Sequence, residues 1–227
     1  MSKTIKYGII GAGVMGQEHI HNINIIDNAE VVAVCDTNEK SNNQARLIIK
    51  DPANFYNNIE DIISNNIADA YIIATPNFSH IDILERMLKT NKHLLVEKPL
   101  CTTTKDCKKF EILSKNYSKI IWTGMEYRYM PPVKQLIEEI RNKTIGQIKM
   151  LSIREHRFPF LHKVNDWNRF AINTGGTLVE KCCHFFDLMR LVIPSEPIKV
   201  YASGNQDVNH LSETYDGKTP DIIDNAF

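Results

Sequence analysis

The residues with the clearest chemical meaning in this sequence are three glycines near its N-terminus, in the run Gly11-Ala12-Gly13-Val14-Met15-Gly16. The run follows an apolar stretch and opens an amphipathic one, so it predicts a tight turn between a strand and a helix. In a dinucleotide-binding turn the first glycine permits the bend, the second lets the backbone approach a pyrophosphate, and the third lets the helix pack closely on the strand. The phosphates would then meet the N–H groups at the helix N-terminus.

An acidic residue stands where such a turn needs one. Asp36 closes the second apolar stretch, twenty residues after Gly16, where a carboxylate would accept hydrogen bonds from ribose hydroxyls. A carboxylate at this place repels a 2′-phosphate, and no Lys or Arg follows before Lys40, so NAD is favoured and NADP is the second choice. The alternative is a glycine turn that binds no ligand, with Asp36 acting as a helix cap.

Two further motifs each come directly after an apolar stretch. They are Thr75-Pro76-Asn77 and Glu97-Lys98-Pro99. Open parallel sheets bind ligands outside the carboxyl ends of their strands, so both motifs are expected to line the same crevice. Lys98 could donate a hydrogen bond to a substrate oxygen, or lower the pKa of a hydroxyl that loses its proton as hydride leaves. The alternatives are an ordinary turn and a solvated surface lysine.

A candidate for proton transfer lies much later, in a stretch with helical spacing. Glu180, His184 and Asp187 are spaced i, i+4, i+7 and therefore share one face of the predicted helix. A histidine that titrates near neutrality suits a general base for alcohol oxidation, and a carboxylate one turn away could orient it. The alternatives are a surface Glu–His pair and a zinc site with Cys182 and Cys183, which adjacent residues serve poorly because they diverge around a helix.

The elements that must position these residues follow from hydrophobic periodicity. Short apolar runs alternate with amphipathic ones up to about residue 124, which predicts βαβ units and a doubly wound parallel sheet of the Rossmann type. The expected strands are 5–10, 31–35, 70–74, 93–96 and 120–122, and the expected helices are 14–26, 39–49, 80–90 and 105–114. Ser79 and either Thr103 or Thr104 are expected to cap helices.

The alternation of short apolar runs and amphipathic runs ends at about residue 124. We therefore divide the chain into a nucleotide-binding domain over 1–124 and a partial substrate and oligomerisation domain over 125–227. Helices are expected from Pro131 to about Asn142 and over 176–193, and strands over 147–156, 198–203 and from Ile222. The fold class is therefore α/β, with an incomplete α+β second domain.

Composition narrows the class of protein. With 227 residues, 43% of them apolar, the chain has room for one large domain or for one and part of a second. Its 27 Lys+Arg balance 27 Asp+Glu, so no charge excess favours nucleic acid or an anionic membrane, and we expect a small-molecule partner. There is no apolar run of about 18 residues and no leader segment, which predicts a cytoplasmic protein. Its five cysteines are expected to be reduced thiols.

Taken together, the motifs resemble the glucose–fructose oxidoreductase, inositol dehydrogenase and MocA family of NAD(P)-dependent enzymes. The resemblance runs along the whole chain through the glycine turn and Asp36, Ala74 to Asn77 with His80, Glu97-Lys98-Pro99, Tyr127-Arg128 with Pro131, and Gly175-Gly176 to Asp187. It implies a Rossmann domain followed by an open, mostly antiparallel sheet domain. The activity it implies is hydride transfer between nicotinamide and a hydroxyl carbon of a sugar, inositol or related polyol.

The resemblance also implies roles for single residues. Lys98 would be the active-site lysine and His184 the acid/base residue. Glu180 would be the third catalytic residue, at a position where members that have all three usually carry Asp. The cofactor would contact Gly11, Gly13, Val14, Met15, Gly16, Asp36, Thr75, Pro76, Asn77, His80, Glu97 and Lys98. Substrate contacts would come from Arg128, His156, Trp167, Asn168 and Arg169, and no metal is implied.

One departure from the family concerns length. Members typically continue well past this point, and their additional strands often form a face for dimerisation, so a full-length member is expected to be a homo-oligomer. This chain resembles a member truncated at its C-terminus. A non-catalytic NAD-binding sensor or an inactive truncated member is therefore the alternative to a working dehydrogenase.

Overall fold

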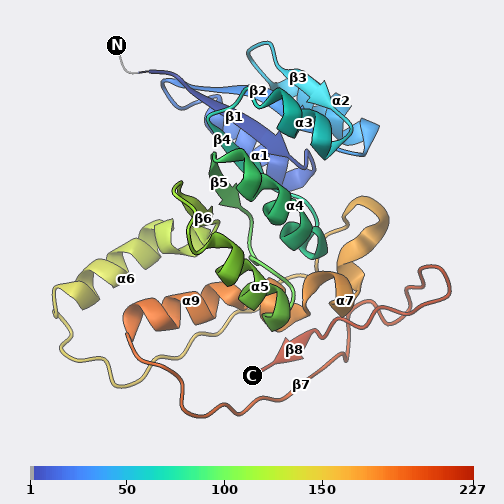
Figure 1. Ribbon diagram of the computed structural model, residues 1–227. Coiled ribbons are helices and arrows are strands. Elements are labelled where there is room, and N and C mark those ends of the chain that lie inside the picture. The colour runs from blue at the N-terminus through green and yellow to red at the C-terminus, as the bar shows by residue number, and fades with distance from the viewer. Residues whose placement is uncertain (1–2) are drawn as a thin grey trace. The chain divides into compact units, whose positions relative to one another are not determined.

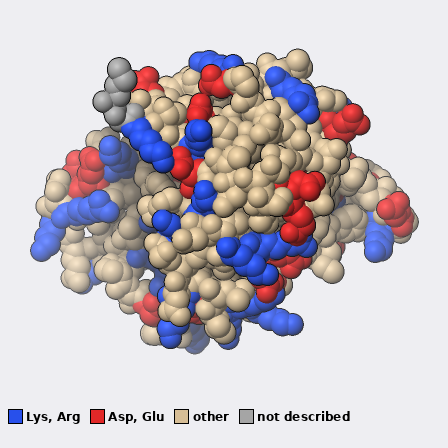
Figure 2. Space-filling view, turned by 45° about the horizontal axis from the view of Figure 1, so that its top comes forward, with Lys and Arg blue, Asp and Glu red and all other residues tan. Residues whose placement is uncertain are grey.

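The structure, a computed structural model, describes residues 3–227 and separates into two compact units. Unit 1 runs up to Gly124 and includes Lys163–Asn165, and unit 2 comprises Met125–His162 and Asp166–Phe227. Side chains of both charge signs are spread over the face that Figure 2 shows, as the equal numbers of acidic and basic residues lead one to expect. Within the described residues, no helix is long and apolar enough to cross a membrane.

Unit 1 is built on a six-stranded parallel sheet with the order β3-β2-β1-β4-β5-β6 (Figure 1). The strands are β1 (Ile5–Ile10), β2 (Ala29–Cys35), β3 (Asn54–Tyr56), β4 (Ala70–Ile73), β5 (His93–Val96) and β6 (Ile121–Thr123). Ile10 pairs with Cys35 on one side and Ile73 on the other, and Ile73 pairs with Val96. The carboxyl ends of the four central strands therefore lie at one edge, with the reversal of strand order between β1 and β4, so the predicted doubly wound sheet is confirmed.

Helices connect these strands. They are α1 (Val14–Ile23), α2 (Glu39–Ile48), α3 (Ile59–Asn65), α4 (His80–Met87) and α5 (Thr104–Ser114), with short 3₁₀ turns η1 (Asn77–Ser79) and η2 (Leu88–Thr90). Thr103 caps α5 by accepting a hydrogen bond from the backbone N–H of Asp106, as predicted. Ser79 is no side-chain cap: its hydroxyl lies 2.7 Å from the carbonyl oxygen of Pro76 and 2.8 Å from the Thr75 hydroxyl.

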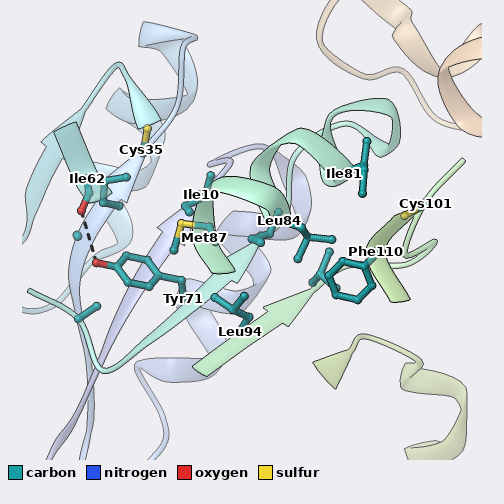
Figure 3. Packing of buried hydrophobic residues seen from close by; sticks show 14 residues of the cluster. Ile10, Cys35, Ile62, Tyr71, Ile81, Leu84, Met87, Leu94, Cys101 and Phe110 are labelled. Carbon is teal, nitrogen blue, oxygen red and sulfur yellow. Dashed lines mark hydrogen bonds between the residues drawn. The ribbon is translucent and has the colours of Figure 1, made fainter. Parts of the chain in front are cut away.

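The core of unit 1 occupies both faces of the sheet, because successive strand residues point to opposite faces. Ile10, Cys35 and Ile73 belong to one cluster, which also contains residues of α3, α4 and α5, among them Ile62, Leu84, Met87 and Phe110 (Figure 3). Their chain neighbours Ile9, Val34 and Ile72 belong to a second cluster with residues of α1 and α2. This two-sided burial explains why the strands are continuous apolar runs.

Unit 2 has long segments without regular secondary structure, and most of its regular structure is short helices. They are η3 (Glu126–Tyr129), α6 (Pro131–Arg141), α7 (Ala171–Thr174), α8 (Thr177–Glu180) and α9 (Cys183–Val192), and the turn η4 (Val164–Arg169), whose first two residues are assigned to unit 1, precedes α7. The antiparallel pair β7 (Gly204–Asn205) and β8 (Asn225–Ala226) forms a small second sheet.

Several expected elements of unit 2 do not form. Residues 147–156 and 198–203 are not strands: within 198–203 only Ser203 exchanges backbone hydrogen bonds in the manner of a strand, with Phe227, and the apolar side chains of Ile198 and Val200 are exposed. The mostly antiparallel open sheet is thus reduced to the two-residue pairing of β7 and β8. The helix expected over 176–193 is two helices, because Lys181 and Cys182 interrupt it.

Candidate functional site

The glycine turn has two glycines that the protein itself requires and one that it does not. Gly11 adopts a φ of +94°, and a Cβ there would lie 2.6 Å from the backbone of Ala74. A Cβ on Gly16 would lie 2.0 Å from the carbonyl oxygen of Gly11. A Cβ on Gly13 would meet no atom within 4 Å. Gly13 thus leaves open space at the N-terminus of α1, which a pyrophosphate could approach closely.

Asp36 is tied to this turn by its carboxylate. Its Oδ2 accepts a hydrogen bond of 2.7 Å from the backbone N–H of Ala12, and its Oδ1 accepts one of 2.7 Å from Asn38. The residue that caps α2 is Asn38, whose side chain accepts from Ser41. A carboxylate has about four acceptor positions, so Asp36 can also accept from ribose hydroxyls. The backbone N–H of Ala12 fixes its orientation toward the turn.

The Thr75-Pro76-Asn77 motif follows β4 at the same edge and is fastened by His80. The His80 ring is fully buried, with Nδ1 2.8 Å from the carbonyl oxygen of Pro99 and Nε2 3.0 Å from that of Thr75. Burial lowers the pKa of His80, although both carbonyls oppose this shift. Since both ring nitrogens face backbone oxygens, we infer that His80 would support the cofactor site by holding two turns together.

Glu97 and Lys98 follow β5, and a histidine from α1 contacts the first of them. His19 Nε2 lies 2.7 Å from Glu97 Oε1, with 20% of the His19 side chain and 10% of the Glu97 side chain exposed. Burial by itself would raise the pKa of Glu97, but the hydrogen bond and charge of His19 outweigh it and lower that pKa. Lys98 is half-buried and precedes Pro99 through a cis peptide bond. Sequence reasoning did not identify His19, because nothing in its spacing indicates a partner 78 residues away.

In unit 2, three consecutive residues of η3 contact the region around His184. Glu126 Oε1 lies 3.3 Å from His184 Nε2. The Tyr127 ring stacks on the His184 ring with centroids 4.2 Å apart and planes 7° from parallel. Arg128 binds Asp187 through two hydrogen bonds, one of them 2.6 Å from Nε to Oδ2, and this contact raises the pKa of Arg128. The Arg128–Asp187 pair therefore holds η3 against α9.

His184 and Glu180 are both buried, with 1% and 8% of their surfaces exposed, so the alternative of a surface Glu–His pair is wrong. Glu180 ends α8 and His184 belongs to α9, so they do not share one continuous helix face. Lys181 lies between these helices and donates a hydrogen bond to the Tyr127 hydroxyl. No spacing or motif in the sequence indicated this contact.

Of the expected substrate residues, Arg169 has the clearest surroundings. It is 1% exposed, and its Nε lies 2.9 Å from Glu213 Oε2. Burial alone would raise the pKa of Glu213, but hydrogen bonds from His210, Tyr215 and Arg169 outweigh it and lower that pKa to about 2. Arg169 is thus paired within unit 2, and its contact with substrate stays a prediction. Asn168 is also buried, Trp167 is half-buried on η4, and His156 is exposed.

Three of the five cysteines, Cys35, Cys101 and Cys182, have thiols that burial makes poor nucleophiles. Burial raises the pKa of Cys35 and of Cys101 to about 12, and it also raises the pKa of Cys182. A thiol of raised pKa is largely protonated near neutrality and is a poor nucleophile and metal ligand. Over residues 3–227, no group of three or more His, Cys, Asp or Glu is arranged to hold a metal ion.

Comparison with known proteins places this geometry in a family. The family model described as "Oxidoreductase family, NAD-binding Rossmann fold" matches residues 5–125, and the model of the associated C-terminal alpha/beta domain matches residues 137–227. Among curated relatives, an inositol 2-dehydrogenase of Salmonella typhimurium is 29% identical over 202 residues, which are 87% of this chain and 58% of the relative. A glucose-6-phosphate 3-dehydrogenase of Bacillus subtilis is also 29% identical, over 84% of this chain and 54% of the relative.

Solved structures share the fold. Scyllo-inositol dehydrogenase from Lactobacillus casei, crystallised with NAD(H) and scyllo-inositol, gives a TM-score of 0.74 at 20% identity, over 90% of this chain and 61% of that one. A myo-inositol dehydrogenase from Corynebacterium glutamicum gives a TM-score of 0.76 at 19% identity, over 91% of this chain and 60% of that one. The chain thus spans a little under two thirds of the length of these proteins.

Proposed function

Because this chain belongs to the Gfo/Idh/MocA oxidoreductase family, we propose that it is an NAD-dependent oxidoreductase that transfers a hydride between nicotinamide and a hydroxyl-bearing carbon of a sugar, inositol or related polyol. The observation that carries this proposal is the open space at Gly13, between two glycines that the fold itself requires. A protein that bound no phosphate there would have no steric need for glycine at this position.

The residues of unit 1 fit NAD. The N–H groups at the start of α1 would bind the pyrophosphate, while Asp36 would accept hydrogen bonds from the adenosine ribose. Val14 and Met15 are 61% and 39% exposed at the start of the same helix, so apolar surface is available to the cofactor there. The negative charge of Asp36 favours NAD over NADP, because a 2′-phosphate would be repelled.

The chemistry is divided between the cofactor and two side chains, Lys98 and His184. When bound, NAD supplies the carbon that accepts or returns the hydride. Lys98 would donate a hydrogen bond to the reacting oxygen and stabilise the charge that develops on it, since an ammonium is a compact donor. His184 would take the hydroxyl proton during oxidation and return it during reduction. Glu126 Oε1, 3.3 Å from His184 Nε2, would orient the ring.

The substrate class is a small polyol. Relatives named as inositol 2-dehydrogenases and as a glucose-6-phosphate 3-dehydrogenase support a cyclic substrate that carries several hydroxyl groups. Such a substrate offers secondary carbinol carbons, which are the groups that a hydride-transfer site of this kind oxidises.

The experiment begins with calorimetric titration of NAD⁺ and NADP⁺ into the 227-residue chain, followed by NADH formation with inositols, sugars and glucose 6-phosphate. Lys98→Ala and His184→Ala should each lose most turnover and keep NAD affinity, whereas the exposed-site controls Lys108→Ala and His21→Ala should behave as wild type. Binding without turnover would favour a non-catalytic NAD-binding protein. No binding would overturn the assignment of the glycine turn.

A further inference from the structure

The contact between Lys181 and Tyr127 is not used by the function proposed above. The Lys181 Nζ donates a hydrogen bond to the Tyr127 hydroxyl oxygen and lies 4.5 Å from the centroid of the tyrosine ring. Only 12% of the Lys181 side chain is exposed, and its second partner is Glu155, at 3.2 Å. Bringing an ammonium into so enclosed a place is unfavourable unless it is well paired, and here it is paired with both groups.

This contact fixes the direction in which the tyrosine can donate. An ammonium carries donors and no acceptor, so the Tyr127 oxygen must accept from Lys181. The hydroxyl hydrogen of Tyr127 then points away from Lys181. The positive charge next to the oxygen also polarises the O–H bond and strengthens it as a donor.

The same tyrosine lies against the proposed acid/base residue. Its ring covers the His184 ring at a centroid distance of 4.2 Å. The Arg128–Asp187 pair, formed by the next residue along the chain, fixes η3 on α9 and so prevents Tyr127 from sliding along the His184 ring. The imidazole of His184 and the phenol of Tyr127, which can each form a hydrogen bond with a substrate hydroxyl, are therefore held in a fixed stack.

We propose that Tyr127 is a further catalytic residue of the proposed reaction, which donates a hydrogen bond to the reacting oxygen, and that Lys181 is the positioning residue that aims it. This inference rests on the proposed function. During oxidation the C–H bond breaks and the hydride leaves with its electron pair for NAD⁺, while the O–H proton passes to His184. Tyr127 keeps its own proton throughout and stabilises the partial negative charge on the oxygen as the C=O bond forms.

The test uses variants that separate the hydroxyl from the ring. Tyr127→Phe keeps the aromatic stack on His184 and removes the hydroxyl, and Lys181→Met removes the ammonium from a chain of similar length. Each is expected to lower kcat about 100-fold, which is in the range measured for the loss of one donor to a developing oxyanion. KM, the NAD Kd and the unfolding midpoint should change little.

A double variant tests whether Lys181 acts through Tyr127. If it does, Tyr127→Phe combined with Lys181→Met should be no slower than Tyr127→Phe alone, because the second change removes a group whose target is already gone. The matched control is the exposed pair Lys199 and Tyr201, in which the ammonium lies 4.8 Å from the ring centroid and Tyr201 is 79% exposed. Tyr201→Phe with Lys199→Met should leave kcat unchanged.

The outcomes separate this inference from the proposed function. If the wild type turns over a polyol and His184→Ala abolishes turnover while Tyr127→Phe retains it, Tyr127 has no catalytic role and the inference is refuted. Independent, multiplying losses in the double variant would refute the positioning role of Lys181. If the wild type binds NAD⁺ and oxidises no polyol, the proposed function fails and this inference fails with it.

Discussion

Replacing Gly13 with alanine should weaken NAD binding without destabilising the protein. The residue has a φ of −69° and a ψ of −162°, which alanine adopts readily, and the added Cβ would meet no protein atom within 4 Å. Alanine also reduces the entropy of the unfolded chain, so the free energy of unfolding should stay constant or rise by up to about 1 kcal/mol.

The effect on binding follows from the same open space. A methyl group on Gly13 would occupy the position from which a pyrophosphate accepts backbone hydrogen bonds at the start of α1. Losing one such charge-assisted bond costs about 1.5–3 kcal/mol. At about 1.4 kcal/mol for each factor of ten, the NAD Kd should rise roughly 10- to 150-fold.

Gly16→Ala is the matched comparison, since it also adds one methyl group in the same turn. Alanine is favoured over glycine inside a helix by about 1 kcal/mol, but its Cβ would lie 2.0 Å from the Gly11 carbonyl oxygen. The overlap should dominate and lower the free energy of unfolding by about 2–4 kcal/mol. Denaturant titration and NAD⁺ calorimetry on both variants check this contrast. A Gly13→Ala protein that binds NAD⁺ as tightly as wild type would refute the reasoning.

Three further perturbations test other parts of the two units. Asp36→Ala removes the acceptor for two backbone N–H groups and the negative charge that repels a 2′-phosphate, so calorimetry should record a weaker NAD⁺ affinity and a smaller preference for NAD⁺ over NADP⁺. The pKa of Glu213 is about 2 in the fold and ordinarily 4.5, so its stabilising effect is present above about pH 4.5 and is lost as the pH falls toward 2. Glu213→Gln should flatten the decline of the unfolding free energy over this window, and an unchanged slope would exclude the ion pair as its source. Asp187→Asn weakens the attachment of Arg128 and η3 to α9. The free energy of unfolding, measured by calorimetry, should fall by about 1–3 kcal/mol, and kcat, measured by NADH absorbance, should also fall.

The architecture of unit 1 could be predicted from the sequence because its determinants are local. The strands predicted over 5–10 and 93–96 agree with β1 and β5, and the glycine spacing correctly placed the turn before α1. The elements β3 and α3 were missed. Strand β3 has three residues and gains its hydrogen bonds from the edge of β2, so too few residues carry its periodicity.

Unit 2 was predicted less well because its apolar patterns lack partners among the described residues. The alternation over 147–156 is typical of a strand, but a strand is stabilised by hydrogen bonds to a neighbour, and none pairs with this segment. The interruption of the expected long helix at Lys181 has a different cause. Lys181 contacts Tyr127 and Glu155, which belong to distant parts of the chain, and such contacts override local helix preference.

The burial and the partners of Arg169 and His184 bear on the roles of these two predicted site residues. Arg169 was a reasonable choice for a substrate contact, since a guanidinium binds oxygen-rich ligands, but it is 1% exposed and paired with Glu213. His184 is equally buried, but its Nε2 faces Glu126, whose side chain is 57% exposed. A proton taken up by His184 therefore has a titratable carboxylate 3.3 Å away that reaches the surface, whereas the charge of Arg169 is neutralised in place. The partners of both groups reach solvent, since the Glu213 side chain is 30% exposed, so the difference lies in the groups themselves: an imidazole can take up and release a proton near neutrality, whereas a guanidinium stays charged.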